Sequence, residues 1–96
     1  MLFQIFLDEA QVHISALTGA FGEIELDPAQ PSPHTMVRAA HTLGSIGGTV
    51  GFDSVLKLGH GLETALIRRN HASNPGGLEA LEVVRQVVTE LEAAVV

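Results

Sequence analysis

The chain has 96 residues, 46% of them hydrophobic, and its formal net charge is −6 with five Lys and Arg residues and no cysteine. This composition suits one domain with a modest core, excludes a disulfide framework, and lacks the basic patch that a nucleic-acid partner requires. No apolar run reaches the ~20 residues of a membrane-spanning helix, so we expect a cytoplasmic domain without membrane insertion.

The first half of the chain predicts two helices. The first is expected from Leu2 to Ala20 and is followed by a linker from Gly22 to Pro31. Ser32 and Pro33 are typical of an N-cap and of a first helical residue, so they predict the start of a second helix that ends near Gly48.

The second half predicts two more helices. A turn from Gly51 to Asp53 precedes the third helix, which is expected to end near Arg69. A loop from Asn70 to Gly77, with a possible cap at Asn74-Pro75, precedes a last helix that runs to Val96. Apolar and small residues recur at helical spacing in all four segments: Phe3, Phe6, Ala10, Ile14 and Leu17; Met36, Ala40, Leu43, Gly47 and Val50; Phe52, Val55, Gly59, Leu62 and Leu66; Leu78, Leu81, Val84, Val88, Leu91 and Val95.

Short connections between long helices favour antiparallel neighbours. The expected fold is therefore all-α, an antiparallel up-down-up-down four-helix bundle that forms a single domain over residues 1–96. Because no tails flank the predicted helices, we expect this domain to be excised from a larger multidomain protein.

His41 lies in the second predicted helix beside unusually small residues. Three, four and seven residues further on, which is the same helix face, are Gly44, Ser45 and Gly48. Glycine costs a helix about 1 kcal/mol relative to alanine. We therefore interpret Gly44 and Gly48 as room for a large partner to approach the imidazole, and Gly47, on the apolar seam, as a site of close helix packing.

Glu63 is the carboxylate expected to reach His41. If the turn between the two helices centres near Gly51 and Phe52, His41 is level with Leu62 and Glu63. A carboxylate that accepts a hydrogen bond from Nδ1–H fixes the tautomer and leaves the Nε2 lone pair outward. Such an imidazole is suited to accept a phosphoryl group, because that reaction mainly requires positioning and in-line access.

A family resemblance follows from these residues. The string His41-Thr42-Leu43, the small residues after it, Thr49-Val50-Gly51-Phe52 and Leu62-Glu63 resemble the histidine-containing phosphotransfer (HPt) domain. The opening Ile5-Phe6-Leu7-Asp8-Glu9-Ala10 is also similar to the first helix of that family. The match covers about residues 2–69 and is closest to HPt domains of chemotaxis-type and type IV pilus chemosensory histidine kinases.

The resemblance implies that His41 is phosphorylated, that Glu63 is hydrogen-bonded to it and orients it, and that His60 belongs to the same local network. The family usually has lysine three residues after the histidine and glycine four after, where this chain has Gly44 and Ser45. Two cations, Arg38 and Lys57, are candidates to replace the lysine. The expected docking face for a kinase or receiver comprises Arg38, Gly44, Ser45, Gly48 and Lys57.

The implied function is a phosphorelay carrier. His41 would accept a phosphoryl group from the ATP-binding domain of a histidine kinase and pass it to an aspartate of a response-regulator receiver domain. The domain would have no cofactor of its own, since ATP and Mg²⁺ are used by those partners, and it is not a complete enzyme alone but the phosphoacceptor domain of a chemotaxis-type sensor kinase. The alternative is a degenerate HPt-like bundle that acts only in docking or dimerisation, with Gly44 marking lost activity.

A metal site is the rival chemistry. His60 and Glu63 form a single i, i+3 pair, whereas di-metal helical bundles need two such pairs and further inward-facing carboxylates. The sequence therefore predicts no metal ligands. The remaining histidines, His13, His34 and His71, are expected to be surface residues.

Overall fold

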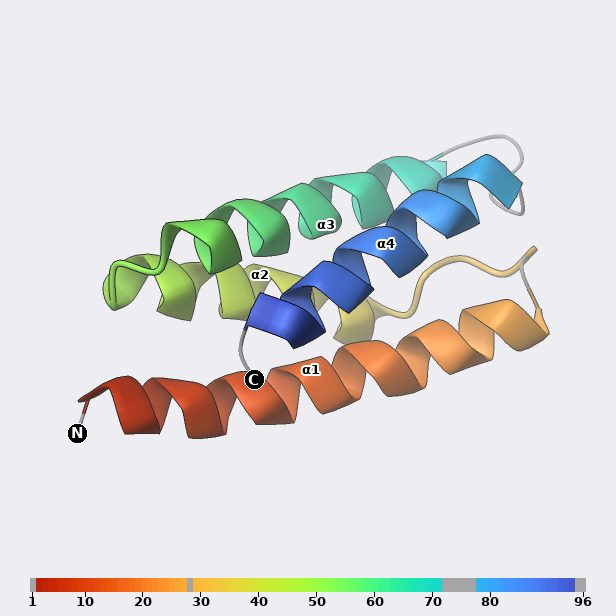
Figure 1. The fold of residues 1–96 in the computed structure, drawn as a ribbon. Coiled ribbons are helices and arrows are strands. Elements are labelled where there is room, and N and C mark those ends of the chain that lie inside the picture. Colours follow the sequence, from red (N-terminus) through yellow and green to blue (C-terminus); the bar gives the residue numbers. More distant parts are fainter. Residues whose placement is uncertain (1, 28, 72–77, 95–96) are drawn as a thin grey trace.

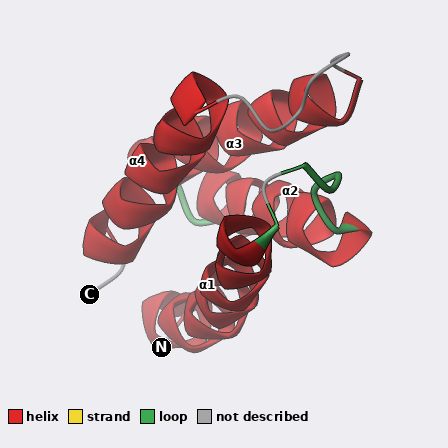
Figure 2. Cartoon of the chain, turned by 90° about the vertical axis from the view of Figure 1, so that its right-hand side faces the viewer, coloured by secondary structure: helices red, strands yellow, loops and turns green. Residues whose placement is uncertain are grey.

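The computed structural model describes residues 2–27, 29–71 and 78–94, and within these ranges it contains helices and no strand. The helices are α1 (Leu2–Leu26), α2 (His34–Thr49), α3 (Asp53–His71) and α4 (Leu78–Ala94). They run alternately up and down in a bundle of 44 × 20 × 19 Å (Figure 1). Each packs against two neighbours, with α2 between α1 and α3, and α4 between α3 and α1 (Figure 2). The predicted antiparallel four-helix bundle is confirmed.

The core is built from the apolar seams that the spacing predicts. Residues of the predicted seams that are buried include Phe6, Ala10, Ile14, Leu17, Met36, Ala40, Leu43, Val55, Leu62, Leu66, Leu81, Val84, Val88 and Leu91. Val50 and Phe52 are half-buried at the α2–α3 turn, while the side chains of Phe3, Leu78 and Val95 lie outside the described part. Among the helices described, none combines the length and apolar character that would let it traverse a bilayer.

Helix α1 is longer than predicted. It continues to Leu26, so the segment expected to be a linker from Gly22 onward starts with helix. Phe21 and Ile24 are buried and extend the apolar seam beyond Ala20, and this burial outweighs the cost of a helical glycine. The helix ends at Leu26, because Pro28 disfavours the helical conformation of the residue before it, which is Asp27.

The start of α2 also differs from the prediction. The N-cap position belongs to Pro33, and no side chain caps the helix there. The Pro33 carbonyl instead accepts hydrogen bonds from the backbone N–H groups of Met36 and Val37, at 3.0 and 3.3 Å. The prediction of Ser32 as N-cap and Pro33 as the first helical residue is therefore wrong by one residue at each position.

Ser32 is buried and anchors the α1–α2 connection to the end of α3. Its Oγ accepts a hydrogen bond from Nη1 of Arg69 at 3.0 Å, and both residues are under 5% exposed. Asn70 accepts from the Ser32 backbone N–H and donates to its carbonyl, at 2.6 and 3.2 Å. Burial lowers the pKa of Arg69. These contacts keep α3 helical to His71, two residues beyond its predicted end, and the predicted cap at Asn74-Pro75 lies outside the described residues.

The turn between α2 and α3 sets the register of the two helices. Gly51 has a φ of +77°, a left-handed conformation that glycine adopts without steric cost. The backbone N–H of Phe52 donates to the Gly47 carbonyl at 2.7 Å, and that of Gly51 donates to Gly48 at 3.2 Å. This tight turn leaves α2 and α3 antiparallel and in contact along their length.

Candidate functional site

His41 and Glu63 form a contact across the α2–α3 interface. Nδ1 of His41 lies 3.0 Å from Oε1 of Glu63. The His41 side chain is 58% exposed and the Glu63 side chain is 25% exposed, so the imidazole faces solvent while the carboxylate is partly shielded. The register deduced from the turn, which makes His41 level with Glu63, is confirmed.

This contact determines the chemistry that the imidazole can perform. An ionised carboxylate only accepts hydrogen bonds, so in this contact Nδ1–H of His41 is the donor and Oε1 of Glu63 is the acceptor. In a neutral imidazole the lone pair then resides on Nε2, the nitrogen that points away from the carboxylate. The arrangement leaves His41 with a nucleophilic nitrogen on an accessible side chain.

His41 lies in an open groove along α2 and α3. The residues that line this groove are His34, Val37, Arg38, His41, Thr42 and Glu63. His34 is exposed, as predicted, but its place beside His41 was not anticipated. The spacing of His34 and His41 indicates this position, because residues seven apart share a helix face.

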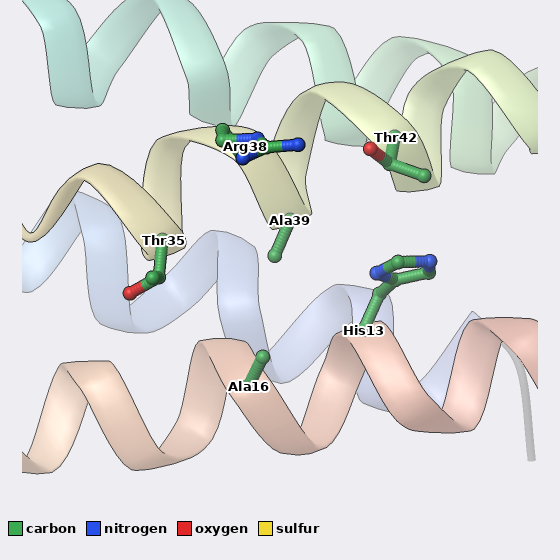
Figure 3. A pocket seen from close by; sticks show the side chains of 6 residues that line it. All are labelled: His13, Ala16, Thr35, Arg38, Ala39 and Thr42. Carbon is green, nitrogen blue, oxygen red and sulfur yellow. The ribbon is translucent and has the colours of Figure 1, made fainter.

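Arg38 is the cation at this groove. It also lines a second groove, between α1 and α2, where it projects from α2 and His13 projects from α1 (Figure 3). Arg38 thus lies on the ridge between the two grooves, one helical turn before His41. Lys57, the other candidate for the missing lysine, is exposed on α3 but is not among the described residues that line the His41 groove.

The structure corrects the interpretation of Gly44. This residue is buried and faces α3, so it does not provide surface for a docking partner. A Cβ on Gly44 would lie 2.5 Å from Cδ2 of His60, and a Cβ on Gly59 would lie 2.6 Å from the backbone nitrogen of Gly44. Gly44 therefore permits close helix packing. The spacing places Gly59 on the facing seam of α3, but it does not predict that Gly59 packs against the backbone of Gly44.

The other small residues near His41 agree with their predicted positions. Gly47 is buried, and a Cβ there would lie 2.8 Å from Cγ1 of Val55, which confirms close packing at this seam position. Ser45 and Gly48 are exposed on the His41 side of α2. They remain candidates for a docking face, with Arg38 and without Gly44.

His60 lies beside His41. The two ring centroids are 5.8 Å apart with an interplanar angle of 31°. His60 extends over Gly44, whose missing side chain leaves space for its ring. His60 and Glu63 are one turn apart on α3, and both approach His41 from the same side of the interface.

Comparisons with known proteins assign the chain to a family. The sequence model of the Hpt domain matches residues 1–94. Chemotaxis protein CheA of Listeria monocytogenes serovar 1/2a and chemotaxis protein CheA of Listeria innocua serovar 6a are each 32% identical over 72 residues. The match covers 72% of this chain but only 12% of each relative. No solved structure gave a significant match. The matched domain, with its exposed histidine, supports a general role as a phosphotransfer carrier, and the chain belongs to the Hpt domain family.

Proposed function

We propose that His41 is the phosphoacceptor of a phosphorelay and that Glu63 orients it. The observation that carries this proposal is the 3.0 Å contact between His41 Nδ1 and Glu63 Oε1 on a side chain that is 58% exposed. An imidazole that serves only to pack would be buried, whereas this one has a defined tautomer and an open approach to Nε2.

The proposed step is an in-line displacement. The Nε2 lone pair forms an N–P bond with the γ-phosphoryl group of ATP as the bond from phosphorus to the ADP oxygen breaks. The Nδ1 proton stays on the ring, where its hydrogen bond to Glu63 stabilises the positive charge that develops on the imidazole. In the second transfer, a carboxylate oxygen of an aspartate attacks the same phosphorus, and Nε2 leaves with its lone pair.

Arg38 supplies positive charge beside the reacting group. A phosphoryl group on Nε2 adds negative charge close to the Glu63 carboxylate, and a nearby cation offsets this repulsion. Arg38 lines the groove that contains His41, in contrast to Lys57. It is therefore the candidate to replace the lysine usual in the family.

The proposed partners are the ATP-binding domain of a chemotaxis-type histidine kinase and the receiver domain of a response regulator. Both relatives are chemotaxis proteins, and this chain corresponds to a small part of each. The partners would supply ATP and Mg²⁺, and would dock over His41, Arg38, Ser45 and Gly48, all exposed on α2.

Phosphoramidate tests this proposal without a cognate kinase, because it transfers its phosphoryl group directly to imidazole and releases ammonia. We expect one acid-labile phosphoryl group per chain, absent from His41→Gln. His13→Gln is the matched control, because His13 also pairs with a carboxylate, Glu9, at 3.7 Å. Labelling of His41→Gln equal to that of the parent chain would contradict the proposal and favour a docking or dimerisation role.

A receiver domain tests the second transfer. The labelled chain is mixed with a receiver domain and Mg²⁺, and we expect the label to move from His41 to the receiver within minutes. Retention of all label on His41 with every receiver tested would contradict the carrier role while leaving the phosphoacceptor assignment intact.

A further inference from the structure

Three potential metal ligands meet at the α2–α3 interface. His41, His60 and Glu63 each place a nitrogen or oxygen donor within 4.8 Å of the others. The sequence predicts no metal site because His60 and Glu63 alone form one pair. The fold adds His41 from α2 as a third donor.

The spacing of these donors suits a small, borderline-soft cation. Zn²⁺ binds His nitrogens and carboxylate oxygens at about 2.0–2.2 Å, so its tetrahedral ligands lie roughly 3.3 Å apart. His41 Nδ1 and Glu63 Oε1 are already 3.0 Å apart. All three donors lie within 4.8 Å of one another, so a modest rotation of the two imidazoles would bring the third donor to this distance. Two imidazoles and one carboxylate favour Zn²⁺ over Mg²⁺, which prefers oxygen ligands.

We propose that His41, His60 and Glu63 bind one Zn²⁺ ion, and that this ion prevents phosphorylation of His41. Two His and one Glu with a fourth position open to water is a ligand set that zinc proteins use. The ligands come from two helices held together by close packing at Gly44 and Gly59, so the fold fixes their backbone positions and only the side chains adjust.

Zinc would block His41 whichever ring nitrogen it takes. On Nε2, the metal occupies the lone pair that would attack phosphorus. On Nδ1, the metal displaces the proton, and the neutral ring then carries its proton on Nε2, which has no lone pair left. If zinc takes Nε2, phosphorylation in turn removes its donor nitrogen, so zinc and the phosphoryl group exclude each other at that atom. This blocking effect rests on the proposed function, whereas zinc binding itself does not.

Gly44 makes this site particular to the chain. His60 occupies the space beside Gly44, with Nε2 only 2.9 Å from the position of a Cβ. The family usually has a lysine at the position of Gly44. Such a long cationic side chain would compete with His60 for this space and would repel a divalent cation. The substitution therefore removes a positive charge and accommodates a ligand.

Isothermal titration of the 96-residue chain with ZnCl₂ tests the binding. We expect one site, with the affinity lowered at least tenfold in His41→Gln, His60→Gln and Glu63→Gln, since even loss of a supporting contact costs a metal site about 10–100-fold. His13→Gln removes a histidine from the other His–Glu pair and should bind as the parent does. The proposal is overturned if His60→Gln and His13→Gln bind equally well, or if MgCl₂ binds as tightly as ZnCl₂.

Circular dichroism of each variant checks that the helices persist. Because His41 is exposed, His41→Gln should fold even if His60→Gln does not. Zinc binding by His41→Gln as tight as that of the parent chain is therefore enough to refute the site. Long-range ¹H–¹⁵N spectra of the histidine rings give independent evidence: zinc should shift the nitrogens of His41 and His60 and leave those of His13 and His71 unchanged. Uniform shifts of all five histidines would indicate adventitious binding and contradict the proposal.

Labelling by phosphoramidate, which proceeds without Mg²⁺, tests the block. We expect saturating ZnCl₂ to lower the initial rate at least tenfold and EDTA to restore it, with weaker inhibition in His60→Gln at the same ZnCl₂ concentration. Bound zinc without inhibition would refute the block but not the site. Failure to label the metal-free parent chain would instead refute the proposed function, while the titration still decides the zinc site.

Discussion

Gly44 on α2 and His60 on α3 lie in direct contact, because a Cβ on Gly44 would be 2.5 Å from Cδ2 of His60 and 3.1 Å from its backbone nitrogen. One turn of small residues thus lets α2 and α3 approach closely. The same approach brings His60 and Glu63 next to His41. Gly44 therefore positions the site through close helix packing and does not open a path to His41, whereas Gly48 stays exposed.

Gly59→Ala should destabilise the bundle by about 1–3 kcal/mol. The new Cβ would lie 2.6 and 2.7 Å from the nitrogen and Cα of Gly44, which are backbone atoms that cannot rotate away. Gly61→Ala is the matched control on the same helix, since nothing lies within 4 Å of its Cβ and helix propensity should raise stability by up to about 1 kcal/mol. Urea denaturation measures both, and an equal gain in the two variants would contradict close packing at Gly59.

Glu63→Gln should slow the phosphorylation of His41 about tenfold or more. A hydrogen bond to a charged group contributes about 1.5–3 kcal/mol, and each 1.4 kcal/mol of transition-state stabilisation is a factor of ten in rate. The amide can also present its NH₂ to Nδ1, which favours the tautomer with the proton on Nε2. The initial rate of phosphoramidate labelling measures the effect. Glu92→Gln, an exposed change on α4, should label at the parent rate, and a Glu63→Gln rate equal to it would remove Glu63 from the site.

Arg38→Ala should slow phosphorylation about two- to fivefold, the scale of an exposed charge interaction. The difference should be largest at low ionic strength and shrink as salt screens the charge. Arg38→Lys should restore most of the rate because it keeps the charge. Arg68→Ala removes another exposed cation, which lines a groove between α3 and α4 and not the His41 groove, and serves as the control. If Arg38→Ala and Arg68→Ala change the rate alike, net charge rather than the position of Arg38 is responsible.

Ser32→Ala should destabilise the fold by about 1–3 kcal/mol without changing the labelling rate of His41. The change removes the acceptor of the Arg69 Nη1–H bond inside a buried contact, and an unpaired buried donor carries that cost. Ser15→Ala, an exposed change within α1, should stay within about 0.5 kcal/mol of the parent. The midpoints of urea denaturation decide between these outcomes; a Ser32→Ala midpoint that matches Ser15→Ala would show that water replaces the lost contact.

The sequence by itself determined the helices and the partner of His41. Apolar spacing identifies the buried face of each helix, and the Gly51 turn sets the register of a local hairpin, so counting outward from it places Glu63 opposite His41. The sequence predicted the helix ends less well. The burial of Phe21 and Ile24 extends α1, and the side chain of Ser32 binds Arg69 and does not cap α2.

Only the tertiary structure decided which glycine lies where two helices approach most closely. Spacing places Gly44, Gly47 and Gly48 on neighbouring parts of one helix surface, but the packing of α3 across that surface buries Gly44 and leaves Gly48 exposed. The same packing adds His60 to the pair of His41 and Glu63. Periodicity along one helix reports which way a side chain faces, whereas the distance to a neighbouring helix depends on side chains from both, and those meet only in the folded bundle.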